Sequence, residues 1–309
     1  MKRPAYAVAL LMLLAAPFFV YPVLLMKVLC FALFACAFNL LLGYTGLLSF
    51  GHAAFFGTAA YVAGHALKVW GLSPLLGIML GAGASALLGW AFGSLAIRRQ
   101  GIYFAMITLA LAQMMYFIFL QVPFTGGEDG LQGVSRGTLF GIMDLEKDLN
   151  LYYFVLAIAV FGFWLIHRAI HSPFGQILKA IRENEARAIS LGYDVAKYKL
   201  LAFVLSAGLA GLAGATKMLV FQFASLTDAH WHMSGEVVLM TILGGMGTVL
   251  GPVVGSAVII TLQNELADKV GSLVTVIMGA IFVICVLLFR RGIVGELAEF
   301  WRRRGAKPI

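Results

Sequence analysis

Long apolar stretches, separated by short polar segments, dominate the chain. The uncharged run 28–67 is long enough for two membrane spans, and the runs 4–26 and 272–289 are each long enough to cross a hydrocarbon core of about 30 Å once. We expect spans at 5–26, 28–43, 49–67, 72–97, 103–122, 151–168, 200–222 and 272–289. The pattern therefore predicts an all-α polytopic membrane protein with about eight transmembrane helices.

The uncharged segment 237–264 is the exception, because Gly244, Gly245 and Gly247 interrupt it near its middle. A single span here would place six C-terminal cations outside the cell: Arg290, Arg291, Arg302, Arg303, Arg304 and Lys307. A re-entrant pair of half-helices keeps them in the cytosol. Each half would have about 14 residues, roughly 21 Å of helix, which is too short to cross alone. We therefore expect a re-entrant broken-helix pair.

A polar segment, residues 172–199, carries eight charged residues between long uncharged stretches. Ser172 and Pro173 form a helix start, and Gly192 is placed to end that helix. One interpretation is an interfacial helix lying on lipid. Since Glu183 and Glu185 would lie poorly against an anionic leaflet, we favour docking on a protein.

Composition and charge narrow the class of protein. With 61% hydrophobic residues, 12% charged residues and a mean hydropathy of +0.95, a water-soluble core is excluded. Positive loops mark the cytosol, and the expected spans place most of the 22 lysine and arginine residues on one side, including Lys2, Arg3, Arg98 and Arg99. We expect one transmembrane domain, 1–309, with both termini cytosolic, a cytosolic loop at 169–199, an external loop at 123–150 and a cytosolic tail at 290–309.

The N-terminus also fits a signal peptide. Because apolar sequence continues through Pro22, a retained first span is favoured. The net charge of +8 follows from topology and attraction to anionic lipid, and it does not indicate nucleic-acid binding. Cys30, Cys36 and Cys285 all fall in apolar runs, so they imply neither a disulfide framework nor a metal site.

Small residues recur every four positions in the fourth expected span, at Gly77, Gly81, Ser85, Gly89 and Gly93. The span 200–222 repeats this arrangement. Such a stripe lets another helix approach closely. It indicates bundle packing, with a moving interface as the alternative.

A second interruption, residues 43–52, contains three glycines and several hydrogen-bonding side chains. Irregular backbone at membrane depth is tolerated where protein or a water-filled cavity satisfies it. Two interrupted segments, one in each half of the chain, indicate a substrate pathway. The alternative, which the sequence supports equally, is a helix–helix turn at the membrane surface together with a kink that serves only packing.

Single ionisable residues are weaker signals. His52 is a candidate to line a pathway or relay protons, although a neutral histidine bonded to a neighbouring helix is favoured. Lys217 is expected to snorkel toward the interface, and Glu236 to favour a helix dipole. The pair His167 and His171 is expected on the opposite side of the membrane from His230 and His232, so the four cannot form one metal site.

The chain shows no nucleophile elbow and no paired intramembrane carboxylates, so an enzyme is disfavoured.

Three stretches, 39–57, 124–131 and 243–252, resemble those of the permease subunits of branched-chain amino acid ABC importers, in the LivM-like branch. The polar segment is similar to the family's cytosolic coupling region. The resemblance implies an internal-repeat importer permease fold in the bacterial cytoplasmic (inner) membrane. It also implies a second homologous permease, in a heterodimer, two cytosolic ATPase subunits that use the ATP, and a periplasmic solute-binding protein. The chain itself would bind no cofactor and hydrolyse no ATP.

The resemblance also suggests residue roles. The ATPase-coupling candidates are Arg182, Glu183, Glu185, Arg187, Leu191 and Gly192. The translocation-path candidates are Asn39, Thr45, Ser49, His52, Gly244, Gly245 and Gly247. Import of urea or short amides, and an ATP-independent secondary transporter or channel, stay open as alternatives.

Overall fold

The computed structural model describes residues 10–139, 143–270, 273, 276–277, 279–281, 283 and 292–296. Its elements, in chain order, are η1 (Ala16–Phe18), α2 (Pro22–Thr45), α3 (His52–Lys68), α4 (Pro74–Ala96), α5 (Ile102–Gln121), η2 (Pro123–Thr125), η3 (Gly127–Asp129), β1 (Thr138–Leu139), β2 (Met143–Asp144), α6 (Asp148–Ile170), α7 (Pro173–Glu183), α8 (Glu185–Ser190), α9 (Val195–Phe221), η4 (Leu226–Ala229), α10 (Trp231–Gly244) and α11 (Gly251–Val270). Lys2, Arg3, Cys285, most of the expected span 272–289 and most of the expected tail 290–309 lie outside the described residues.

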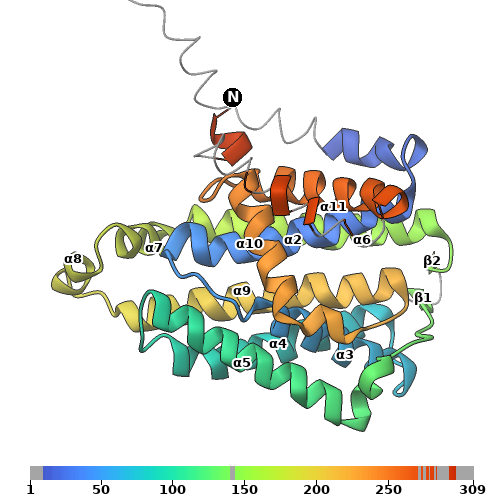
Figure 1. Cartoon of the computed structure of the whole chain (residues 1–309), viewed down its shortest axis with the longest axis horizontal. Coiled ribbons are helices and arrows are strands. Elements are labelled where there is room, and N and C mark those ends of the chain that lie inside the picture. Colours follow the sequence, from blue (N-terminus) through green and yellow to red (C-terminus); the bar gives the residue numbers. More distant parts are fainter. Residues whose placement is uncertain are drawn as a thin grey trace, which may run out of the picture.

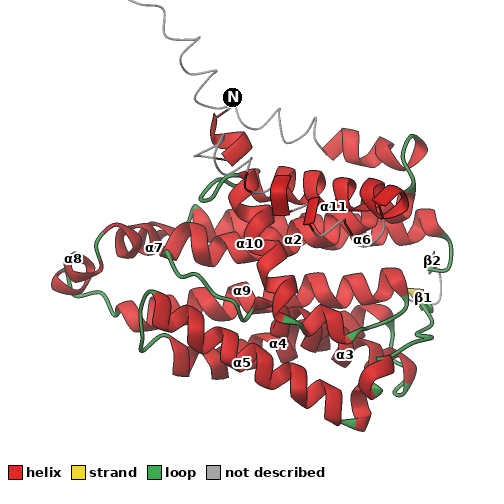
Figure 2. Ribbon diagram, in the orientation of Figure 1, coloured by secondary structure: helices red, strands yellow, loops and turns green. Residues whose placement is uncertain are grey.

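The helices form a bundle with two distinct ends (Figure 1). One end carries α7 and α8, and the other carries the short antiparallel β1–β2 hairpin. Helices account for nearly all of the ordered structure (Figure 2), which confirms a helical protein, although the hairpin was not foreseen. Five described helices are long and apolar enough to cross a membrane: α2, α4, α5, α6 and α9. The count of eight full spans stays a prediction.

Helix α9 lies at the centre and packs against α2, α3 and α4. The small-residue stripe of α4 faces α3 and α9, which confirms close helix packing along it. The moving-interface alternative stays a prediction. A Cβ added at Gly81 would lie 2.7 Å from the Ala59 carbonyl oxygen. Ser85 Oγ donates a hydrogen bond of 2.6 Å to the Phe55 carbonyl. These helices approach closely because the stripe carries no bulky side chain.

The expected boundary between the first two spans, at residues 26–28, is wrong. Helix α2 begins at Pro22 and runs without a break through Lys27 to Thr45. Pro22 occupies the first helical turn, where its fixed φ and missing N–H are tolerated, and Tyr21 before it is non-helical. Proline therefore sets the start of this helix, and Lys27 lies inside it.

The polar segment folds as two short helices where one was expected. Pro173 opens α7 as predicted, but Ser172 Oγ bonds to the Ala169 carbonyl at 2.7 Å and does not cap the helix. The chain breaks at Asn184, whose side chain accepts the Arg187 N–H at 3.0 Å and caps α8. Gly192 follows with a φ of 87°, a left-handed conformation that favours glycine.

The predicted break in segment 237–264 is confirmed between α10 and α11. Helix α10 crosses the other long helices instead of running along them (Figure 1), and it packs against α11, α2 and α3. The expected equal halves are wrong, because α10 has 14 residues and α11 has 20. The re-entrant course stays a prediction.

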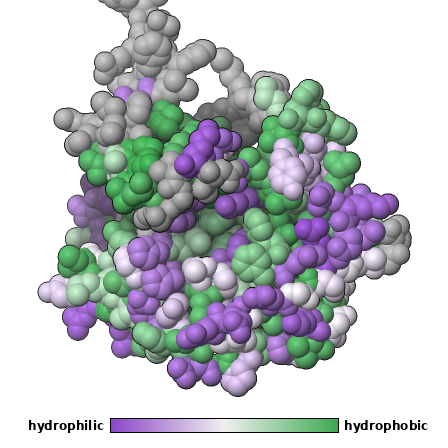
Figure 3. Space-filling model, turned by 45° about the vertical axis from the view of Figure 1, so that its right-hand side comes forward, coloured by the Kyte–Doolittle hydropathy of each residue, from purple (hydrophilic) through white to green (hydrophobic). Residues whose placement is uncertain are grey.

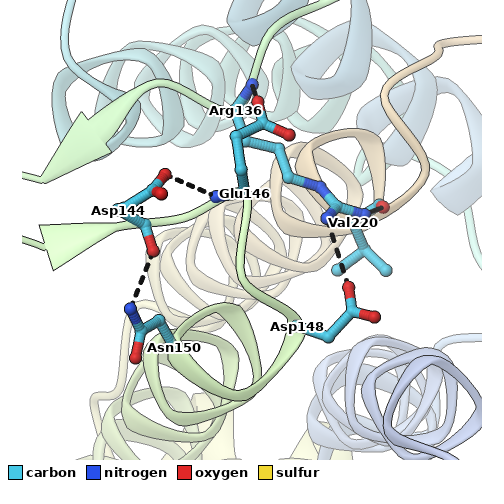
Figure 4. Close-up of polar contacts among 6 residues, drawn as sticks. All are labelled: Arg136, Asp144, Glu146, Asp148, Asn150 and Val220. Carbon is cyan, nitrogen blue, oxygen red and sulfur yellow. Dashed lines mark hydrogen bonds and ion pairs between the residues drawn. The ribbon is translucent and has the colours of Figure 1, made fainter.

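The loop 122–147 is fastened to the bundle by Arg136 (Figure 4). Its guanidinium donates to the Val220 carbonyl at 2.8 Å, at the end of α9, and to Asp148 at 3.3 Å, at the start of α6. The Arg136 backbone N–H donates to Glu146 at 3.3 Å. One side chain thus ties the β1–β2 end to two long helices.

Candidate translocation and coupling site

The interruption between α10 and α11 is bonded to Asn39 of α2, four residues before the interruption at 43–52. Asn39 Nδ2 donates to the Thr248 carbonyl at 2.8 Å, and its Oδ1 accepts the Gly247 N–H at 2.9 Å. Asn39 is buried in α2. The buried Asn39 amide uses both its N–H donor and its oxygen acceptor. It therefore holds the turn between α10 and α11 against α2.

Glycine is required within that turn. Gly245 has a φ of 119° and Gly247 a φ of 75°, both outside the range that other residues adopt without strain. Gly244 ends α10 in close contact with Gly251 and Pro252. The three path candidates from the second half of the chain therefore shape one turn.

The segment 46–51 between α2 and α3 is not helical, and the protein satisfies its polar groups locally. Thr45 Oγ1 accepts the Leu47 N–H at 3.4 Å, and Ser49 Oγ accepts the Gly51 N–H at 3.2 Å. The Phe50 N–H donates to Thr108 Oγ1 of α5 at 3.1 Å. Thr45 and Ser49 are buried. Their hydroxyls stabilise irregular backbone where water is scarce.

His52 lies fully buried at the first residue of α3, away from the cavities described below. Its Nε2 is 2.8 Å from Ser206 Oγ of α9, and that hydroxyl donates to the Ala37 carbonyl at 2.6 Å. Phe38 and Phe55 pack edge-on against its ring. The predicted hydrogen bond to a neighbouring helix is present. The neutral state of His52 and its role in the path stay predictions.

Arg182 of α7 joins the polar segment to the first interruption. Its Nη1 donates a hydrogen bond to the Gly43 carbonyl in the last turn of α2. One turn earlier in α7, the Lys179 ammonium lies 5.7 Å from the centre of the Tyr44 ring. A cavity of about 410 Å³ opens here, lined by Gly43, Tyr44, Lys179, Arg182, Glu183 and Gly247. Residues from the expected coupling group and the expected path group therefore line one space.

Helix α8 presents a different kind of surface. Glu185 pairs with the buried Lys199 of α9 at 2.7 Å, and Ala188 is buried beneath the helix. Ile189 and Leu191 remain 58% and 69% exposed. Of the coupling candidates, Leu191 thus faces outward, while Glu185 is engaged within the chain. Ile189 was missed, although its position beside the buried Ala188 could have indicated it.

At the β1–β2 end, the expectation that Lys217 snorkels is wrong. Its Nζ lies 2.8 Å from each carboxylate oxygen of Asp228, and both residues are buried. The chain after α9 turns back at Gln222, so η4 carries Asp228 to the last turns of α9. An ion pair satisfies the lysine inside the protein, which removes the need to reach water.

Among the residues the structure describes, no group of three or more His, Cys, Asp or Glu side chains is placed to hold a metal ion. The site instead consists of interrupted helices, a satisfied irregular backbone and an arginine-bridged cavity. This arrangement defines a polytopic helical membrane protein of the transporter class.

Comparison with known proteins gives the family. Residues 22–286 match the branched-chain amino acid transport system / permease component family, and the chain belongs to that family. The high-affinity branched-chain amino acid transport system permease proteins LivM of Salmonella typhimurium and Escherichia coli are each 26% identical over 88% of this chain. The chain spans only 66% of the length of these two relatives.

A second kind of relative is similar over less of the chain. The ribose import permease protein RbsC of Bacillus subtilis is 27% identical, over 76% of this chain and 73% of its own length. No solved structure is significantly similar to this chain.

Proposed function

We propose that the chain is the membrane-spanning permease subunit of an ATP-driven importer and forms part of the translocation path for branched-chain amino acids. The observation that carries this proposal is the cavity where Arg182 meets Gly43 and Gly247. A transport subunit needs a contact through which movement of a cytosolic surface reaches the pathway. The family membership and the LivM relatives support the solute class.

The proposed assembly has a second homologous permease, two cytosolic ATPase subunits and a periplasmic solute-binding protein, in a bacterial cytoplasmic membrane. The ATPases use the ATP and dock on α8, where exposed Ile189 and Leu191 offer an apolar anchor between charged neighbours. The solute-binding protein docks at the β1–β2 end, where Arg136 is bonded to Asp148 of α6 and Val220 of α9. Both termini then lie in the cytosol.

The coupling step follows from these contacts. ATP-driven closure of the ATPases moves α7 and α8. The ion pair between Glu185 and Lys199 joins α8 to the first turns of α9. Arg182 transmits this movement to the end of α2, and Asn39 carries it to the turn after α10. If Arg182 makes different contacts with the ATPases open and with the ATPases closed, the path is biased to open toward one side of the membrane in each state.

Other solutes within the transporter class remain as alternatives. The similarity to a ribose import permease favours a sugar as the second candidate, and urea or short amides form a third. An ATP-independent transporter or channel would need a coupling ion site within the spans.

The proposal is tested by uptake into proteoliposomes that contain the complex purified from its native membrane. Leucine, isoleucine and valine should accumulate only when both ATP and the solute-binding protein are present, with urea and ribose as competitor controls. Thermal-shift screening of the binding protein against the same solutes gives an independent assignment. Uptake without ATP, or preference for urea or ribose, would contradict the proposal.

A further inference from the structure

A second cavity lies near the β1–β2 end and holds an unusual set of charges for a membrane protein. It has a volume of about 240 Å³ and is bordered by α2, α9, η4, α10 and α11. Its ionisable lining residues are Lys27, Lys217, Asp228 and Glu236. Figure 3, which turns this end forward, shows hydrophilic side chains spread among hydrophobic ones over the surface.

Two of these four charges are already matched. The Lys217 ammonium binds both oxygens of Asp228 at 2.8 Å and also lies 4.7 Å from the centre of the Phe223 ring. Asp228 further accepts the Ser225 N–H at 3.2 Å. This pair fixes the chain after α9, and its charges are satisfied within the protein.

Lys27 and Glu236 are not matched in this way. They come from different helices, α2 and α10, and both are half-buried. Neither forms a direct ion pair with another residue among those the structure describes, and both line the cavity. The Gln263 side chain of α11 lines the same cavity as Glu236, and a carboxylate has several acceptor positions for a ligand.

The rest of the lining is apolar. Phe31, Phe221 and Met233 contribute aromatic and thioether surface around the two charges. The volume lies just below the range of about 300–1,000 Å³ that is typical of pockets for drug-sized ligands. A cavity of this volume suits a solute smaller than a drug. The cavity thus combines one cation, one anion and an apolar wall.

We propose that Lys27 and Glu236 form a binding site for the zwitterionic head of an aliphatic amino acid, with Lys27 on its carboxylate and Glu236 on its ammonium. The aliphatic side chain then packs against Phe31, Phe221 and Met233. This inference rests on the proposed function and adds the residues that would recognise the solute within the permease. A sugar or urea carries no charge, so neither would need two opposed ions in a half-buried cavity, where unpaired charges are costly.

The test measures binding in the cavity directly. In the full complex, Phe223→Cys introduces a thiol into the cavity lining at a position outside the proposed ligand contacts. Cys285→Ser reduces background, since Cys30 and Cys36 are buried. The rate of maleimide labelling is measured with leucine, with 4-methylvalerate, which lacks the ammonium, and with isoamylamine, which lacks the carboxylate. Leucine should slow labelling. To slow labelling to the same extent, each analogue should need a concentration at least about tenfold higher than that of leucine.

Lys27→Gln and Glu236→Gln should each weaken protection by leucine about tenfold. Lys197→Gln, which removes an exposed charge that pairs with Asp194 outside the cavity, is the matched control and should change nothing. Glu236→Asp keeps the charge and should retain part of the protection, which a purely structural role would not predict.

The two proposals fail differently. If wild-type proteoliposomes accumulate leucine with ATP but leucine gives no protection, or protects Lys27→Gln equally, the site is wrong and the proposed function stands. If ribose or urea protects as well as leucine, the zwitterion assignment is overturned. If wild-type proteoliposomes show no ATP-dependent leucine uptake, the proposed function itself fails.

Discussion

Asn39 and Gly247 lie 208 residues apart in the sequence, yet the amide oxygen of Asn39 accepts the Gly247 backbone N–H at 2.9 Å. The same amide donates to the Thr248 carbonyl at 2.8 Å. One buried side chain in α2 thereby fixes the turn between α10 and α11. Since Arg182 binds the Gly43 carbonyl one turn further along α2, the turn and helix α7 are connected through a single helix end.

Replacing Asn39 tests this connection. Asn39→Ala leaves the part-buried Gly247 N–H without its side-chain acceptor, which costs about 0.5–1.5 kcal/mol and should loosen the turn and reduce uptake. Asn39→Asp keeps the acceptor but sets a second oxygen against the Thr248 carbonyl, so it should also impair uptake. Ser94→Ala, which removes an exposed side-chain hydrogen bond of 2.7 Å within α4, is the control. Uptake equal to that of the wild type in both Asn39 variants would show that the Asn39 contact has no role in transport.

The ion pair of Lys217 and Asp228 should contribute to stability only as a pair. Asp228→Asn leaves a buried ammonium uncompensated and should lower the free energy of unfolding by about 3–5 kcal/mol. The double variant Lys217→Met with Asp228→Leu removes both charges and should recover most of that loss. Thermal unfolding of the purified protein in detergent measures both effects. A double variant less stable than Asp228→Asn would contradict the assignment.

The small-residue stripe of α4 supplies a matched pair of glycines. A Cβ at Gly81 would lie 2.7 Å from the Ala59 carbonyl oxygen, whereas a Cβ at Gly83 would meet nothing within 4 Å. Gly81→Ala should therefore destabilise the protein by about 1–3 kcal/mol through overpacking. Gly83→Ala should be neutral or slightly stabilising, because alanine is the better helix former. A melting temperature that changes equally in both variants would refute the close packing of α3 and α4.

The proposed ATPase-docking surface is tested at Glu183 and Arg187. Both side chains are exposed, on α7 and α8 respectively, so their removal should leave the fold and membrane insertion intact. Glu183→Ala and Arg187→Ala should abolish ATP-dependent uptake if these charges contact the ATPase. Lys197→Ala, an exposed charge on α9, is the control and should keep normal uptake. Normal uptake in the first two variants would remove them from the coupling surface.

Much of the architecture could be predicted from the sequence because bilayer thickness and backbone hydrogen bonding leave few solutions. Apolar runs indicated the helices, and the glycines at 244–247 indicated the break after α10. The start of α2 was placed wrongly because Pro22 lies within one apolar run, where hydropathy gives no boundary. The break at Asn184 was missed because the apolar periodicity continues from Ile181 to Ala188 across it.

Contacts between distant segments could not be predicted in the same way. That Arg182 reaches Gly43, or that Asp228 returns to Lys217, depends on how the helices pack and how the chain folds after α9. Local patterns carry no information on such pairings. The sequence thus indicated both groups of candidate residues, while the structure showed that Arg182, Glu183, Gly43 and Gly247 share one cavity.

The central claim, that Arg182 couples the cytosolic helices to the pathway, is tested most directly by the number of leucine molecules imported per ATP hydrolysed. In proteoliposomes with the complete complex, Arg182→Ala should retain ATP hydrolysis but import about tenfold less leucine per ATP, because the contact that transmits the movement is lost. Arg182→Lys keeps a charge that can reach the Gly43 carbonyl and should recover part of the ratio. A ratio in Arg182→Ala equal to that of the wild type would contradict the account.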